Sequence, residues 1–187
     1  MRISWLLAGL GAAGLVSAGL AAEPSPYAGQ QTRPIKALSQ AETGDLLAGR
    51  GMGLAKAGEL NGYPGPAHVL DMAAALQLSP PQVAAVTAIR DRMSAAARPL
   101  RAEIVRRERA LNAQFADGTI TQPLLAKETE ALGDLYGKLR AVHLSAHLET
   151  KAVFTPEQVA RYAQLRDYTA ASAPPDQAMP EPMHHGG

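Results

Sequence analysis

The stretch SPPQVAAVTAIRDRMSAAARPLRAEIVRRERALNAQFA, residues 79–116, decides the fold. It opens with Ser79 as the predicted N-cap, a proline at the first helical position, and Gln82 three residues after the cap, where its side chain can bond back to the cap. Apolar residues then recur every three or four positions as far as Phe115, which predicts one long amphipathic helix. Pro99 lies inside this pattern and removes one backbone hydrogen bond, so we expect a bend there.

A second long helix follows after a short turn. Asp117 and Gly118 end the first helix, because glycine tolerates the left-handed backbone that often follows a helix. Thr121 is the predicted N-cap of the second helix, and a leucine- and alanine-rich stripe carries it to about Val153. Two long helices joined by so few residues lie antiparallel, so the sequence predicts a helical hairpin from about 80 to 153.

Shorter helices flank this hairpin. A capping box at Ser39 opens a short helix that runs to about Ala48, and helical spacing returns at 68–76 and 156–168. Hydrophobic residues make up 47% of the chain and aromatic residues only 4%, which favours alanine- and leucine-rich helices over strands. The predicted fold class is therefore all-α, a long antiparallel helical hairpin with short flanking helices.

A bare hairpin leaves apolar surface uncovered, which the short helices and a second copy of the chain would close. Leu144 and Leu148 lie about 140–180° from Leu139 on a helical wheel, away from the stripe that packs within the chain. We therefore expect a homodimer, with these two leucines as candidate contacts. Ordinary exposed leucines are the alternative.

The N-terminus has the layout of a secretory signal peptide. Arg2 supplies a positive charge, residues 3–20 are apolar or small, and Ala21 or Ala22 offers the cleavage site. A retained membrane anchor is the alternative, because the apolar run is nearly long enough to span a bilayer. We expect export to the periplasm, with no stable membrane insertion after cleavage. The predicted organisation is a signal peptide (1–21), an extended Gly- and Pro-rich arm with a short helix (22–65), a helical domain (66–170) and a disordered tail containing Pro and His (171–187).

Composition excludes several classes of function. The 187 residues contain no cysteine, which excludes disulfides, zinc–thiolate sites, iron–sulfur clusters and thiol catalysis. Lys and Arg (18) nearly balance Asp and Glu (17), so we expect no nucleic-acid partner. No motif assembles a nucleophile, a base and an oxyanion donor, so we expect no enzymatic activity.

Two short motifs repeat on either side of the hairpin. Residues 78–82 read LSPPQ and residues 154–158 read FTPEQ, two variants of the pattern Leu-Thr-x-x-Gln, and each opens a predicted helix. This pairing resembles the Spy/CpxP family of bacterial periplasmic proteins, over roughly residues 66–168. Serine in place of threonine keeps a cap, and phenylalanine in place of leucine keeps an apolar anchor. The motif residues are Leu78, Ser79, Gln82, Phe154, Thr155 and Gln158.

The resemblance implies a binding protein rather than an enzyme. The family contains ATP-independent chaperones, envelope-stress regulators and metal-responsive proteins. In the chaperones two curved hairpins form a cradle-shaped dimer whose concave face binds unfolded clients. The resemblance therefore implies unfolded or misfolded periplasmic proteins as partners, with a sensor kinase as a further candidate.

The first long helix is rich in arginine. Seven arginines stand against three acidic residues between Pro80 and Ala116. A guanidinium on an apolar stem suits partly exposed, negatively charged polypeptides, and a solvated helix face is the alternative. The candidate client-binding residues are Arg98, Arg101, Arg106, Arg107 and Arg109.

His143 and His147 are four residues apart, which places both imidazoles on one face of the second long helix. That spacing suits two ligands of Zn²⁺, Cu²⁺ or Ni²⁺, with His68, Glu149 or a second copy of the pair as further ligands. A partly buried, hydrogen-bonded pair is the alternative. The sequence requires no cofactor, and the candidate ligand of this site is a divalent metal, Zn²⁺, Cu²⁺ or Ni²⁺. We expect the tail to bind metal only adventitiously, through Met179, Met183, His184 and His185.

Overall fold

The computed structural model describes residues 25–168. The expected signal peptide and the expected tail lie outside the described residues. The chain divides into a short unit that ends at Gln31 and a larger unit that begins at Thr32. The described elements are the 3₁₀ helix η1 (Gln30–Thr32) and the helices α1 (Gln40–Ala48), α2 (Lys56–Glu59), α3 (Pro66–Asp71), α4 (Pro80–Ala116), α5 (Gln122–Ala152) and α6 (Pro156–Leu165).

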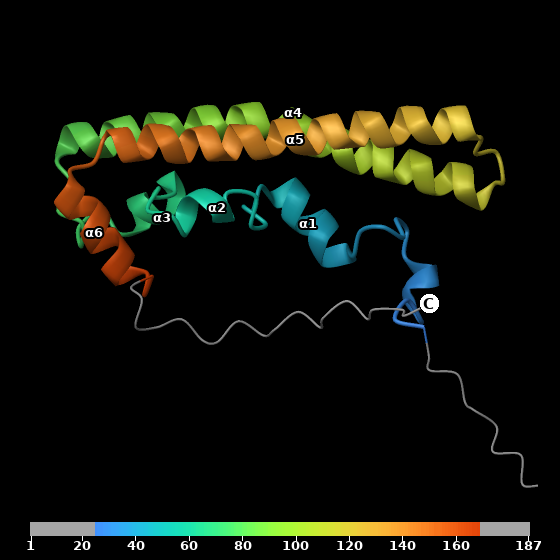
Figure 1. Cartoon of the computed structure of the whole chain (residues 1–187), viewed down its shortest axis with the longest axis horizontal. Coiled ribbons are helices and arrows are strands. Elements are labelled where there is room, and N and C mark those ends of the chain that lie inside the picture. Colours follow the sequence, from blue (N-terminus) through green and yellow to red (C-terminus); the bar gives the residue numbers. More distant parts are fainter. Residues whose placement is uncertain (1–24, 169–187) are drawn as a thin grey trace, which may run out of the picture. The chain divides into compact units, whose positions relative to one another are not determined.

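The described part of the chain is helical throughout and contains no strand, so the predicted all-α class is confirmed. α4 and α5 lie side by side and antiparallel as the predicted hairpin (Figure 1). Ser79 and Gln82 form the capping box that opens α4, and Thr121 caps α5. Gly118 in the connecting turn has a φ of 65°, which explains why glycine stands there. Pro99 lies inside α4 without ending it.

The three short helices α1, α2 and α3 pack on the hairpin. α1 contacts α4, α2 contacts α5, and α3 contacts both, so these three helices follow one another along the hairpin (Figure 1). The short helix predicted after Ser39 is found as α1, and the described residues around it are not simply extended, because Ile35, Leu38 and Ala55 are buried. The first core cluster consists of Ile35, Leu38, Leu46, Ala97, Ile104, Val105 and Leu139.

α6 lies across the end of the hairpin where α4 begins (Figure 1). Its Tyr162 is fully buried and forms a second core cluster with Val69, Leu76 and Val86. α3 ends at Asp71, earlier than the helical spacing predicts, and the chain reaches α4 through turns. No helix in the described part of the chain is both long and apolar enough to span a bilayer.

Candidate functional site

The two motif glutamines meet at the end of the hairpin. Gln82 lies in the first turn of α4 and Gln158 in the first turn of α6. The Gln82 amide donates to Gln158 Oε1 at 2.8 Å, and the Gln158 amide donates back to Gln82 Oε1 at 3.2 Å. The Gln82 amide also donates to the backbone carbonyl of Val153 at 3.0 Å, and the Gln158 amide to that of Leu76 at 3.5 Å. Both amides therefore use their donors to join separate chain segments.

The carbonyl ends of the same side chains complete the two capping boxes. Gln82 Oε1 accepts from the Ser79 N–H at 3.0 Å, and Gln158 Oε1 accepts from the Thr155 N–H at 3.1 Å. The apolar residues of the two motifs pack against the second core cluster. The repeated motif is thus a clasp that fixes two helix N-termini against each other. Its apolar members are Leu78 and Phe154.

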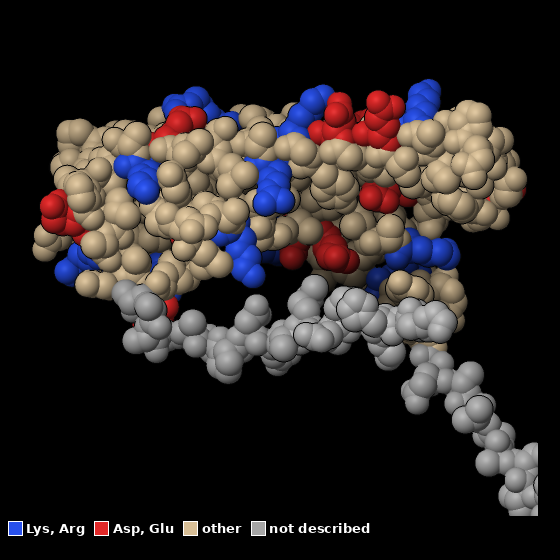
Figure 2. Space-filling model, viewed as in Figure 1, with Lys and Arg blue, Asp and Glu red and all other residues tan. Residues whose placement is uncertain are grey.

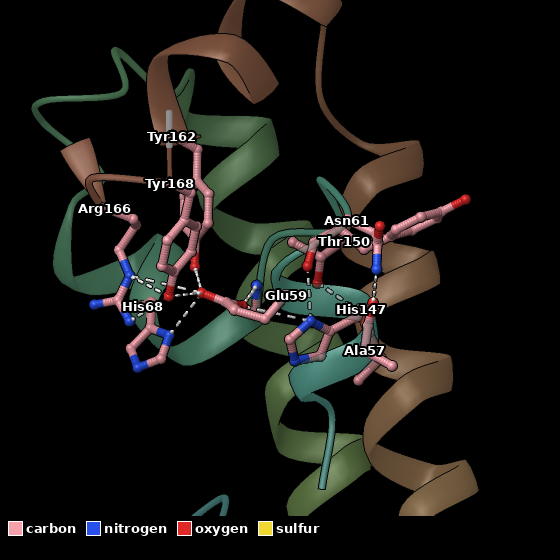
Figure 3. Close-up of polar contacts among 12 residues, drawn as sticks. Ala57, Glu59, Asn61, His68, His147, Thr150, Tyr162, Arg166 and Tyr168 are labelled. Atoms are coloured by element: carbon pink, nitrogen blue, oxygen red, sulfur yellow. Dashed lines mark hydrogen bonds and ion pairs between the residues drawn. The ribbon is translucent and has the colours of Figure 1, made fainter. Parts of the chain in front are cut away.

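Glu59 forms a second polar centre near this clasp. It is the last residue of α2, and its side chain is only 11% exposed. The hydroxyl of Tyr162 donates to Oε1, and the hydroxyl of Tyr168 donates to Oε1 at 3.2 Å (Figure 3). The backbone N–H of Gly65 donates to Oε2 at 3.1 Å. Burial, and then the hydrogen bond to Glu59, raise the pKa of Tyr162, so its hydroxyl stays protonated as a donor.

Three basic side chains surround the same carboxyl group (Figure 3). His68 Nδ1 lies 3.4 Å and Arg166 Nε 3.6 Å from Glu59 Oε1. His147 Nδ1 lies 3.6 Å from Oε2. Glu59 therefore links α2, α3, α5, α6 and the segment that follows α6.

His147 is fixed by the backbone of the arm. Its Nδ1 lies 2.7 Å from the carbonyl oxygen of Tyr63. A carbonyl oxygen can only accept, so Nδ1 carries the proton of this bond. Gly65 packs against the same ring: a Cβ added there would lie 2.9 Å from His147 Cε1 and 3.1 Å from Glu59 Oε2. Only glycine fits between these two side chains.

His143 is also buried, but its partner is a cation. Arg101 Nη2 lies 2.8 Å from His143 Nε2, so the guanidinium donates and the imidazole accepts. Burial, and then the charge of Arg101, lower the pKa of His143 to about 4. His143 is therefore neutral at pH 7, and its Nε2 lone pair is occupied.

The expected metal-binding pair shares a cavity with further ligand-type residues. His143 and His147 are joined there by His68, Glu59 and Met52, around a volume of about 400 Å³. No group of three or more His, Cys, Asp or Glu side chains among residues 25–168 is arranged to hold a metal ion. The hydrogen bond from Arg101 occupies the lone pair of His143 Nε2, which disfavours a metal shared by His143 and His147.

The candidate client-binding arginines separate into three groups. Arg101 is buried against the hairpin, with 6% of the residue exposed. Arg106 and Arg107 both pair with Glu103, at 2.6 and 2.8 Å. The hydrogen bond from Arg106 is the main cause that lowers the pKa of Glu103 to about 2. Arg98 and Arg109 are exposed, and no ion pair of the described chain includes them.

The hairpin surface mixes apolar and charged side chains. The face shown in Figure 2 carries basic and acidic side chains scattered over a largely uncharged surface, some of them next to each other. A groove of about 300 Å³ between α4 and α5 is lined by Ile89, Met93 and Val142, with Arg92 and Glu149 at 2.5 Å from each other among its walls. The exposed large apolar residues include Leu47, Leu60, Phe115, Leu148 and Leu165.

One expected dimer contact is used within the chain. Leu148 is 57% exposed, as a contact surface requires. Leu144 instead packs against the arm, where a Cβ added at Gly58 would lie 3.4 Å from its Cδ2. The homodimer itself stays a prediction.

Glu59 and Arg101 differ in the sequence signal that could have predicted their burial. Glu59 stands in a glycine-rich stretch without helical periodicity, so nothing in its surroundings predicts burial. Arg101 had a usable signal, because it lies between buried Ala97 and Ile104 at spacings of four and three.

Comparison with known protein families gives a match over the hairpin. The sequence model described as LTXXQ motif family protein matches residues 67–166, which is more than half of the chain. No curated protein and no solved structure matches. This chain combines a long helical hairpin with two glutamine capping motifs. The chain belongs to the LTXXQ motif family, in agreement with the resemblance to Spy/CpxP-type proteins.

Proposed function

We propose that this protein is an ATP-independent periplasmic chaperone or envelope-stress adaptor of the Spy/CpxP type. Membership of the LTXXQ motif family is the observation that carries the proposal. The proposal includes export, with cleavage of the N-terminal segment near Ala21 or Ala22, and function without a nucleotide or an enzymatic step.

The surface of the hairpin supports a binding role. Exposed apolar side chains such as Phe115 and Leu148 can contact apolar client segments. Arg109 is exposed and unpaired in the described chain, so its charge is available to acidic groups of a client. Arg106 retains an exposed side chain while it pairs with Glu103. Such contacts are individually weak and reversible, as repeated capture and release require.

The test is suppression of aggregation. The purified exported form is mixed with a chemically denatured model protein, and light scattering is followed on dilution without ATP. We expect suppression at near-stoichiometric amounts of this protein. Phe115→Ser and Arg109→Gln should each weaken suppression, while Arg140→Gln, an exposed arginine on α5, is the matched control.

Circular dichroism shows whether each variant is folded. Absence of suppression by the folded wild-type protein contradicts the chaperone role. Equal loss in Arg109→Gln and Arg140→Gln contradicts the assignment of the surface, but not the activity.

Metal binding is the alternative function. The cavity next to α2 favours it, because His68, His147 and Met52 all line it, and imidazole with thioether ligands suits copper. Calorimetry with Cu²⁺, Zn²⁺ and Ni²⁺ on protein ending at Ala173 tests this role without the tail. His147→Ala and His68→Ala should reduce binding, whereas binding weaker than about 10 μM contradicts a sensor role.

A further inference from the structure

Arg101 is a buried cation without an acidic partner. The residue is 6% exposed, and its Nε is buried without any hydrogen-bond partner. Its one hydrogen bond runs to His143, which is neutral at pH 7. None of the ion pairs in residues 25–168 includes Arg101. A buried charge that lacks a counter-charge is costly, so a second binding partner is expected at this point.

A small pocket opens beside this guanidinium. Its volume is about 230 Å³. One wall is a single face of α4, where Ser94, Arg98 and Arg101 follow one another at spacings of four and three. The other wall is the last turn of α1 with Gly49, residues 46–49. We call it the Arg98–Arg101 pocket.

The lining of this pocket is positively charged. It contains two guanidinium groups and no carboxyl group. The last turn of α1 opposes this with about half a negative charge from its carbonyl dipoles. Two of those carbonyls, of Asp45 and Leu46, already accept from the N–H groups of Arg50 and Gly49. The two arginines together therefore keep the pocket net positive.

We propose that the Arg98–Arg101 pocket binds a small oxyanion. Guanidinium groups hold phosphate, sulfate and carboxylate by paired N–H···O bonds, and the Ser94 hydroxyl supplies a further donor. The bound oxyanion provides the counter-charge that Arg101 lacks within the chain. Its source is either a free inorganic ion or a carboxylate presented by a polypeptide. The site does not depend on the chaperone role.

The experiment titrates inorganic phosphate into the purified protein and follows its melting temperature, with sodium chloride at equal ionic strength as reference. We expect a saturable rise with phosphate and none with chloride. Arg98→Gln should weaken the phosphate affinity about tenfold, because it removes one charge-assisted partner. Arg140→Gln, which removes an exposed arginine elsewhere, should leave the affinity unchanged.

Arg101→Gln should abolish the rise in melting temperature with phosphate. If Arg101→Gln does not fold, the loss of phosphate affinity in Arg98→Gln tests the proposal instead. A phosphate response equal to the chloride response overturns the proposal, and so does equal weakening in Arg98→Gln and Arg140→Gln. Competition by N-acetylglutamate identifies a polypeptide carboxylate as the source, whereas phosphate binding without competition identifies the free ion.

Discussion

The side chains of Gln82 and Gln158 hydrogen-bond to each other in both directions, although 76 residues separate them. Each amide also caps its own helix, so that one side chain performs a local and a long-range function together. This double use explains why a glutamine is needed: a glutamate in the same place can cap a helix but cannot donate across the gap.

Gln82→Glu is expected to destabilise the fold by about 2 kcal/mol, because it replaces a donor by an acceptor. The new oxygen would face the Val153 carbonyl and Gln158 Oε1, both of which now accept from Nε2. Urea unfolding at pH 7 measures the change. Gln164→Glu, on the exposed side of α6, makes the same change of charge and should be nearly neutral. Equal effects of the two variants would contradict the clasp.

Gly65→Ala is expected to cost roughly 1–3 kcal/mol of stability, because the added methyl group has to displace His147 and Glu59. Gly51→Ala is the matched control, since no atom lies within 4 Å of a Cβ there. Thermal unfolding of both variants checks the difference. A Gly65→Ala variant as stable as the wild type would show that the ring of His147 is not held where the structure has it.

Gly133→Ala and Gly137→Ala should each stabilise the protein by about 0.5–1 kcal/mol, because both lie inside α5 with open space around a Cβ. Gly118→Ala should instead destabilise, since that residue has a φ of 65°. The melting temperatures of the three variants show whether each substitution stabilises or destabilises the protein. No gain at 133 or 137 would indicate that another chain packs closely against this face of α5.

Stability is expected to fall as the pH falls from about 6.5 to about 4, because His143 has a lowered pKa in the folded state. The unfolded chain binds a proton on this histidine below about 6.5, whereas the folded chain does so only near 4. The contribution of His143 to the free energy of unfolding is present in full above pH 6.5 and is on the order of 3 kcal/mol.

Urea unfolding at pH 7 and pH 5 tests this dependence. His143→Gln keeps an acceptor for Arg101 but cannot titrate, so its stability should fall less between the two values. An unchanged loss in His143→Gln would assign the dependence to other groups.

The sequence predicts helices well here because their signals are local. The capping boxes at Ser79 and Thr155 and the apolar stripe of α4 are each visible within a few residues. His143 and His147 are both buried residues of α5, where their spacing of four is likewise a local feature.

What the sequence could not predict are contacts between distant segments. The two glutamines each cap a helix in the expected manner, yet nothing local shows that they meet. Glu59 takes its partners from positions as far away as Tyr168, and the arm around it carries no periodic pattern. Arg101 is predicted as a client-binding residue, yet it lies on the side of α4 that buries Ala97 and Ile104.

The bond between Tyr162 and Glu59 joins residues 103 positions apart, while the hairpin forms from neighbouring helices. Local contacts form faster than those that close long loops, so the hairpin should assemble before the arm is fastened to α6. A chain synthesised from its N-terminus presents the arm first and its last partner, Tyr168, only at the end. Glu59, which is buried in the folded protein, therefore stays in water until almost the whole described chain has been synthesised.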